Sequence, residues 1–148
     1  MPDEQTIIEH IRGRYERDRR IPHPGEIAVA ERAGAVTLRG TVASPGQRRA
    51  AVHIASSVSG VRSVNDELVI DPRDRWEDDT IRGAALQAVM SNPDLGDRVD
   101  VTVANGWLTL KGQVKHQTDS DAAFNAVSGL AGIGGITNEI KVVAAGTA

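Results

Sequence analysis

Residues 34–42 read GAVTLRGTV and residues 105–114 read NGWLTLKGQV, and these two stretches decide the fold. Both contain the order Gly-x-x-Thr-Leu-x-Gly-x-Val, and the second copy begins 72 residues after the first. The match extends without a gap from residues 27–70 to residues 99–142, where 11 of 44 positions are identical. A match of this length indicates a duplicated folding unit, so fold and binding chemistry are expected twice.

The first copy starts with the pattern of a helix and a hairpin. Over residues 3–18, apolar side chains recur at helical spacing and predict an amphipathic helix, which the prolines at 22 and 24 end. Residues 27–31 and 35–42 alternate apolar and polar side chains, as half-buried strands do. The turn between these strands contains Gly34, as a hairpin requires.

The rest of the first copy predicts one more helix and one more strand. Ser44, Pro45 and Gln47 are typical of a helix start, because serine caps, proline fits the first turn and glutamine completes a capping box. Gly60 ends this helix, and residues 64–70 are expected to form a third strand.

The second copy predicts the same order. Its helices are expected at about residues 77–91 and 117–130, and its strands at 99–103, 107–114 and 136–143. The expected fold class is α+β, with two α-β-β-α-β units that each hold a three-stranded mixed sheet and two helices on one face. The expected domains are residues 1–72 and 73–148, and units of this size are expected to pack together, with an oligomer as a further option.

Composition excludes several classes of protein. Cysteine is absent, which excludes disulfides, thiolate metal sites and a cysteine nucleophile. The net charge is −3, so the basic surface of a dedicated nucleic-acid-binding protein is missing. No apolar run reaches the roughly 18 residues of a membrane span, and the acidic N-terminus does not resemble a secretory signal. A cytoplasmic location is therefore expected, with peripheral membrane contact as an option.

The spacing of these elements resembles the BON domain, a small module of bacterial envelope and osmotic-stress proteins. The resemblance rests on residues 34–42 and 105–114 and on the later segments GVRSVNDEL (60–68) and GIGGITNEI (132–140), and it covers nearly the whole chain. It implies a tandem BON protein without catalytic activity. It also implies phospholipid binding, or, as in some cytoplasmic relatives, potassium binding.

The sequence contains no constellation typical of an enzyme. The four histidines, at positions 10, 23, 53 and 116, fall on unrelated elements and share no metal-ligand spacing. The glycines at 132–135 lack the helix and lysine of a phosphate-binding loop. We therefore expect no catalytic residues, no metal site and no cofactor.

Gly40 and Gly112 occupy the same position in the two copies, inside a strand. A glycine there usually marks a bulge or a close approach of two backbones. We interpret both glycines as structural.

Five arginines gather at the end of the first helix. Cations at this position complement the negative end of the helix, and acids among them neutralise part of their charge. A contact with anionic lipid is the functional alternative to a solvated surface. The candidate residues are Arg12, Arg17, Arg19 and Arg20.

The first helix of the second copy carries two apolar faces. Ile81, Ala84, Ala85, Ala88 and Val89 form the face expected to point toward the core. Apolar side chains also lie on the opposite side, with a glycine among them, and the first copy has nothing similar. This second face either packs on a protein surface or contacts a membrane. It comprises Trp76, Gly83, Leu86 and Met90.

Three functional hypotheses follow. The first is peripheral binding of anionic phospholipid through the first helices, in stress or envelope homeostasis. The second is a sensor of monovalent cations, with carbonyl groups of glycine-rich turns as ligands. The third is a scaffold that binds only protein partners.

Overall fold

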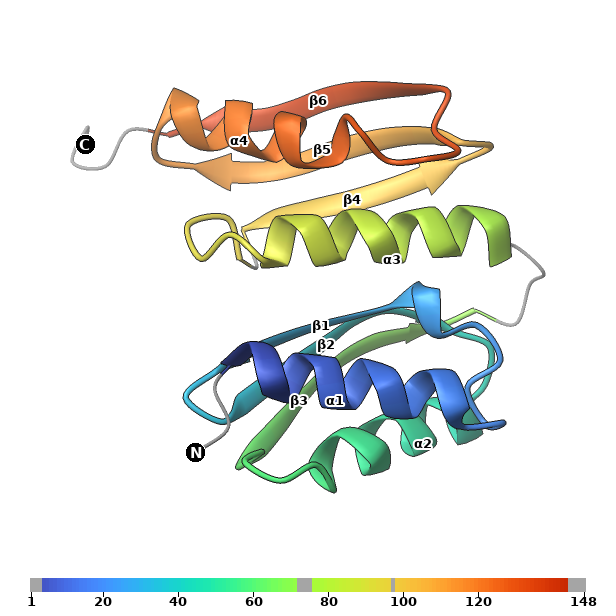
Figure 1. Ribbon diagram of the computed structural model, residues 1–148. Coiled ribbons are helices and arrows are strands. Elements are labelled where there is room, and N and C mark those ends of the chain that lie inside the picture. The colour runs from blue at the N-terminus through green and yellow to red at the C-terminus, as the bar shows by residue number, and fades with distance from the viewer. Residues whose placement is uncertain (1–3, 72–75, 97, 144–148) are drawn as a thin grey trace.

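The computed structural model describes residues 4–71, 76–96 and 98–143, and the side chains within them except at positions 4, 5 and 76. The first unit holds α1 (Glu4–Arg17), a 3-10 turn η1 (Pro24–Glu26), β1 (Ile27–Arg32), β2 (Ala35–Val42), α2 (Pro45–Ser56) and β3 (Ser63–Ile70). The second holds α3 (Trp76–Met90), β4 (Val99–Ala104), β5 (Trp107–Val114), α4 (Gln117–Val127) and β6 (Gly135–Val142). The predicted α+β fold of two α-β-β-α-β units is confirmed (Figure 1).

Each unit contains one three-stranded mixed sheet. The strand orders are β1-β2-β3 and β4-β5-β6, and in both sheets the first pair is antiparallel and the second pair parallel. The registers are the same in the two copies, because Gly40 lies opposite Ile27 and Gly112 lies opposite Val99. The repeat in sequence is therefore a repeat in strand pairing.

Gly40 and Gly112 lie where the backbone before the first strand approaches the middle strand. Both have a positive φ, +131° and +142°. A Cβ at Gly40 would collide with the carbonyl of Glu26, and a Cβ at Gly112 would collide with the carbonyl of Arg98. Only glycine fits this conformation and this space.

The hairpin turns differ between the copies in how well their residues suit the backbone. Ala33 and Gly34 both have positive φ (52° and 86°), as do Asn105 and Gly106 (51° and 80°). This pair of angles is typical of a type I′ turn, in which asparagine is favoured at the first position and alanine is strained. The second copy therefore has the better turn sequence.

Each unit has an apolar core, and the second core extends through α3 onto the first sheet. The first core lies between α1, α2 and one face of the first sheet, with Ile11, Leu38 and Ile54 at most 1% exposed. The second core includes Ala28 of β1 together with side chains of α3 and the second sheet. Since Ala28 alternates with Ile27 and Val29, α3 packs on β1 and β2 at the face of the first sheet that α1 and α2 leave free. On β3 the same face is open, and Val69 is 52% exposed there. Figure 1 shows α3 between β1 and β4.

The expected division of α3 into a core face and an outer face needs correction. Ala85 and Val89 are fully buried as expected, but Ile81 and Ala88 are half-buried and Ala84 is exposed. The sequence alone could not show this, because α3 packs on two sheets at once and α4 lies beside it.

Candidate functional site at the junction of the two units

Gly83, at the middle of α3, lies against the backbone of η1. A Cβ at Gly83 would collide with the carbonyl oxygen of Gly25, so glycine is required for this contact. Glu26 lies at the same place and is 7% exposed. Its burial raises the pKa of its carboxyl to about 7, and the charge of Asp79 on α3 adds to the effect. An acidic group that titrates near neutral pH is thus part of the junction.

The C-terminal half of α3 buries the apolar stripe that the sequence singled out. Leu86 is fully buried and Met90 is 9% exposed, and both belong to the cluster that contains Ala28. Of the two interpretations of this stripe, packing within the protein therefore describes Gly83, Leu86 and Met90, and a free apolar surface does not. The side chain of Trp76 lies outside the described residues.

Gln87 covers the edge of the first sheet. Its Nε2 donates to Val29 O at 2.8 Å, and its Oε1 accepts from Val29 N at 2.9 Å. The side-chain amide thus satisfies both backbone groups of Val29, as a neighbouring strand would do at this position of β1. Arg12 of α1 donates to the same Oε1 at 2.6 Å and to Ile27 O at 3.4 Å. Arg12 therefore belongs to the junction, although the sequence suggested a lipid contact for it.

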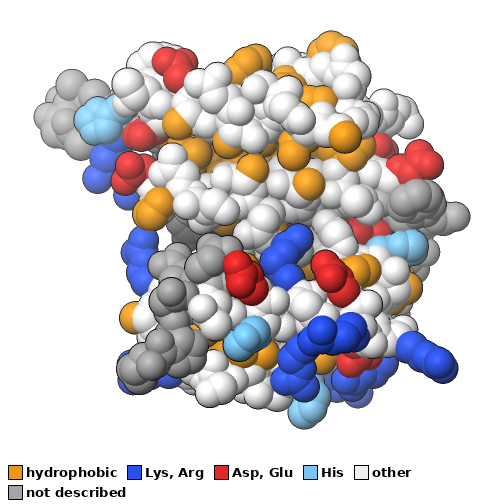
Figure 2. Space-filling model, in the orientation of Figure 1, with side chains coloured by type: hydrophobic (Ala, Val, Ile, Leu, Met, Phe, Trp, Pro, Cys, Tyr) orange, Lys and Arg blue, Asp and Glu red, His pale blue; other side chains and the backbone are white. Residues whose placement is uncertain are grey.

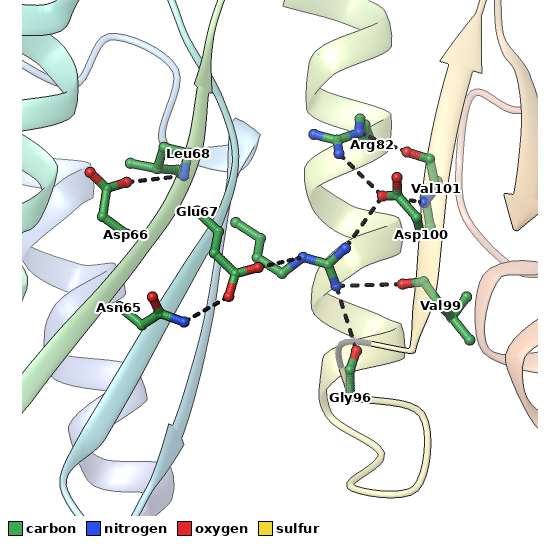
Figure 3. Close-up of polar contacts among 10 residues, drawn as sticks. Asn65, Asp66, Glu67, Leu68, Arg82, Gly96, Val99, Asp100 and Val101 are labelled. Atoms are coloured by element: carbon green, nitrogen blue, oxygen red, sulfur yellow. Dashed lines mark hydrogen bonds and ion pairs between the residues drawn. The ribbon is translucent and has the colours of Figure 1, made fainter. Parts of the chain in front are cut away.

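Arg39 of β2 reaches from the first sheet to the second unit, where its partners include Gly96, Val99 and Asp100. Figure 3 labels these partners. The Nη1 of Arg39 lies 3.5 Å from Gly96 O and 3.4 Å from Val99 O, and its Nη2 lies 3.3 Å from Asp100 Oδ1. Its Nε is 3.8 Å from a carboxylate oxygen of Glu67. The side chain is 10% exposed, so these carbonyl and carboxylate oxygens replace most of the water that the guanidinium would otherwise bind.

Arg82 of α3 binds Asp100 as well. It donates from Nε to Val101 O at 2.7 Å and from Nη2 to Asp100 Oδ1 at 3.3 Å. Val99 and Val101 lie on β4, an edge strand, so Arg39 and Arg82 cover its free carbonyl groups (Figure 3). The junction therefore covers the edges of both β1 and β4.

On the two remaining edge strands, β3 and β6, a side chain of the strand itself binds one of its backbone N–H groups. On β3 the N–H of Leu68 donates to Asp66 Oδ1 at 3.0 Å, and Arg48 of α2 holds Asp66 at 2.6 Å. On β6 the N–H of Ile140 donates to Asn138 Oδ1 at 3.0 Å. Ser120 of α4 accepts from this asparagine at 3.0 Å. The same device occurs at equivalent positions of both copies and works against pairing with a foreign strand.

A cleft of about 460 Å³ opens beside the junction. Arg39, Glu67 and Asn65 of the first sheet form one side, and Gln87, Met90 and the turn after α3 form the other. The polar groups on its walls already bind one another, since Asn65 donates to Glu67 and Gln87 binds Val29. We therefore attribute the cleft to the packing of the two units, because these side chains already bind other groups of the protein.

The surface beside the junction combines an apolar seam with basic residues. The seam lies between α3 and α4 and consists of Ile81, Ala84, Ala88, Ala122, Ala126 and Leu130, which are half-buried or exposed. Figure 2 shows hydrophobic side chains over this seam and basic side chains over α1 and α2 on the same face. Arg17, Arg19 and Arg20 are exposed, and Arg20 is paired with Asp18 at 2.8 Å.

The described residues show no site of another kind. The four histidines are exposed and lie apart on different elements. Within the described ranges, no group of three or more histidine, aspartate or glutamate side chains could hold a metal ion. No helix of these ranges is long and apolar enough to cross a membrane.

Sequence reasoning missed Glu26, Arg39 and Gln87. One signal for the junction was available: the outward positions 28 and 30 of β1 are both alanine, whereas the equivalent positions of β4 are Asp100 and Thr102. Small apolar side chains on both faces of a strand indicate that both faces are covered.

The chain matches a known domain profile twice, once in each unit. The profile of the BON domain matches residues 3–72 and 77–144. Osmotically-inducible protein Y of Escherichia coli (strain K12) is 31% identical over 123 residues, which are 78% of this chain, and the chain spans 61% of that relative's length. Among solved structures, the C-terminal domain of CdsD, a structural protein of the type III secretion system of Chlamydia trachomatis, aligns over 95% of this chain and 67% of its own, with a TM-score of 0.39 and 12% identity.

Proposed function

Because the chain belongs to the BON domain family, we propose that it is a non-enzymatic, stress-related module that binds anionic phospholipid peripherally. The contact surface that we propose is the seam between α3 and α4, together with the exposed arginines at the end of α1, Arg17 and Arg19. One observation carries this proposal: the seam is apolar and accessible, and it lies on the same face as basic side chains (Figure 2).

The chemistry of the seam fits shallow insertion. Ala84 is exposed, and Ile81 and Ala88 are half-buried on the same face of α3. Small apolar side chains along a helix can enter the boundary between headgroups and acyl chains, and in water they expose only a small apolar surface.

The arginines supply the electrostatic part of the proposed contact. Arg17 and Arg19 are exposed, whereas Arg12 is engaged in the junction and is left out of the proposal. Each cation near an anionic bilayer contributes about 1 kcal/mol, which corresponds to roughly a fivefold change in affinity. Such attraction weakens as salt rises, so binding is expected at low ionic strength first.

Flotation with phosphatidylglycerol vesicles tests this proposal, with phosphatidylcholine vesicles as the comparison. The wild type is expected to float with the anionic vesicles, Ala84→Asp to lose most of this binding, and the double variant Arg17→Ser/Arg19→Ser to lose about 25-fold in affinity. Thr102→Asp, an exposed change on the other sheet face, is the matched control and should bind as the wild type does.

Two results would contradict the proposal. A wild type that stays in solution with anionic vesicles at low salt argues against lipid binding altogether. Equal binding by Ala84→Asp and the wild type argues against the seam. If lipid has no effect while potassium raises the melting temperature above its value in sodium, the cation-sensor hypothesis takes its place.

A further inference from the structure

Within the described residues, α3 packs on the outer face of β1 and β2 in the first sheet, whereas no helix packs on the outer face of the second sheet. Trp107 lies on this face, since it alternates with the fully buried Leu108 and Leu110, and it is 51% exposed. Thr109 and Thr137 lie beside it on β5 and β6, and both are half-buried. A large aromatic side chain is thus presented to solvent on a flat polar surface.

Trp107 is held in place rather than free to rotate. Its Nε1 donates to Thr137 Oγ1 at 2.8 Å, which joins β5 to β6 through their side chains. The indole ring lies over Gly135, because a Cβ at that position would collide with three ring carbons. One face of the ring therefore rests on backbone and the other is open. Holding a contact group in its binding orientation in advance reduces the entropy lost on binding.

The first copy has no such arrangement. Ala35 and Ser63 occupy the positions of Trp107 and Gly135, and they lie opposite each other in the same register. The bulky ring and the glycine that makes room for it are thus a matched pair found in the second copy only. This pairing is a specialisation of the second copy, because the fold itself forms without it.

The charges around the ring favour a neutral ligand. Lys111 lies opposite both Asp100 on β4 and Glu139 on β6, and Asp100 is also paired with Arg39 and Arg82. Opposite charges therefore balance, and the face does not select for an anion or a cation. The neighbours of the ring on the sheet are Ala104, Thr109 and Thr137, which offer one methyl group of alanine and two threonine hydroxyls and no long apolar side chain. The ring can stack on an apolar ligand face while the threonine hydroxyls bind polar groups at its rim.

We propose that the outer face of the second sheet binds a neutral saccharide, with a pyranose ring stacked on Trp107. A pyranose matches this surface because the C–H groups of one ring face contact the indole while hydroxyl groups reach Thr109 and Thr137. Trp107 supplies the contact area, and Gly135 and Thr137 fix its orientation.

Saturation-transfer NMR with maltotriose, cellotriose and chitotriose tests the proposal on the full chain. At least one of these trisaccharides is expected to show saturable transfer, strongest on the protons of one pyranose face. Trp107→Ala is expected to weaken binding at least tenfold. Thr137→Val, which frees the ring without removing it, should weaken binding less. Phe124→Ala is the matched control, since Phe124 is 40% exposed on α4 and should be dispensable.

Circular dichroism and thermal melting of each variant separate loss of binding from loss of fold. Absence of saturable transfer for all three trisaccharides up to about 10 mM, where the weakest specific contacts would still register, overturns the saccharide assignment. Unchanged binding by folded Trp107→Ala overturns the assigned position. A concentration-dependent dimer that Trp107→Ala abolishes shows that this face binds a second copy of the chain, which also overturns the proposal.

Discussion

Glu26 makes the stability of this protein depend on pH in a direction opposite to that of most paired carboxylates. Its carboxyl is buried against α3 near Asp79, and its pKa rises from the ordinary 4.5 to about 7. Below pH 4.5 the group is protonated whether the chain is folded or unfolded, so it imposes no cost. Between these values the unfolded chain ionises first, and the free energy of unfolding falls as pH rises. Above pH 7 the carboxyl is ionised in both states, and the folded chain carries the full free-energy cost of the buried charge.

The size of this effect follows from the two pKa values. At 1.36 kcal/mol for each pH unit, the rise sets an upper limit of about 3 kcal/mol. Glu26→Gln stays neutral at every pH, so it is expected to match the wild type at pH 4 and to exceed it by about 1–3 kcal/mol at pH 8. Urea unfolding followed by circular dichroism at pH 4, 6 and 8 measures this difference, with Glu139→Gln as an exposed control. A difference that is independent of pH, or larger in acid, would refute the reasoning.

Three further changes test the junction and the hairpins. Gly83→Val should lower the free energy of unfolding by about 1–3 kcal/mol, since the valine side chain meets the backbone of η1. Gly129→Ala is the control, because position 129 faces open space and the change should have little effect. Equal melting temperatures for the two variants would contradict the close approach. Ala33→Asn should raise stability by about 0.5–1 kcal/mol in urea unfolding, because asparagine tolerates the positive φ; a loss would argue against the type I′ turn. Gln87→Ala should speed hydrogen exchange at the amide of Val29 at least tenfold by NMR, and an unchanged rate would show that the edge is protected in another way.

Local patterns predicted the elements of this fold because each signal is confined to a few neighbouring residues. Ser44 does accept from Gln47 N at 3.2 Å, so the serine cap is confirmed. The side chain of Gln47 accepts from Ala43 N at 2.9 Å, one residue before the N-cap that a capping box would use. The alternation within the strands likewise gave the face that each strand buries. The repeat then gave the second unit from the first.

The arrangement of the units could not be obtained in the same way. Leu86 and Met90 differ from the residues around them only in being apolar, and apolar side chains serve equally to dock a sheet or to enter a membrane. The roles of Arg39 and Gln87 depend on partners 57 or more residues away, which no local pattern reveals. The alanines at positions 28 and 30 were the available signal, and they acquire meaning only beside the aspartate and threonine of the second copy.

The position of α3 between the sheets bears on how this duplication can evolve. A chain that lost its second unit would expose Ala28 and the edge of β1, and one that lost its first unit would expose Leu86 and Met90. Either deletion uncovers apolar surface that the remaining unit cannot bury, and such surface favours aggregation. The two copies have therefore become mutually dependent: each is free to change on its outer faces, as Trp107 illustrates, but neither can be discarded. A gene built by duplication has in this way become a single unit of selection.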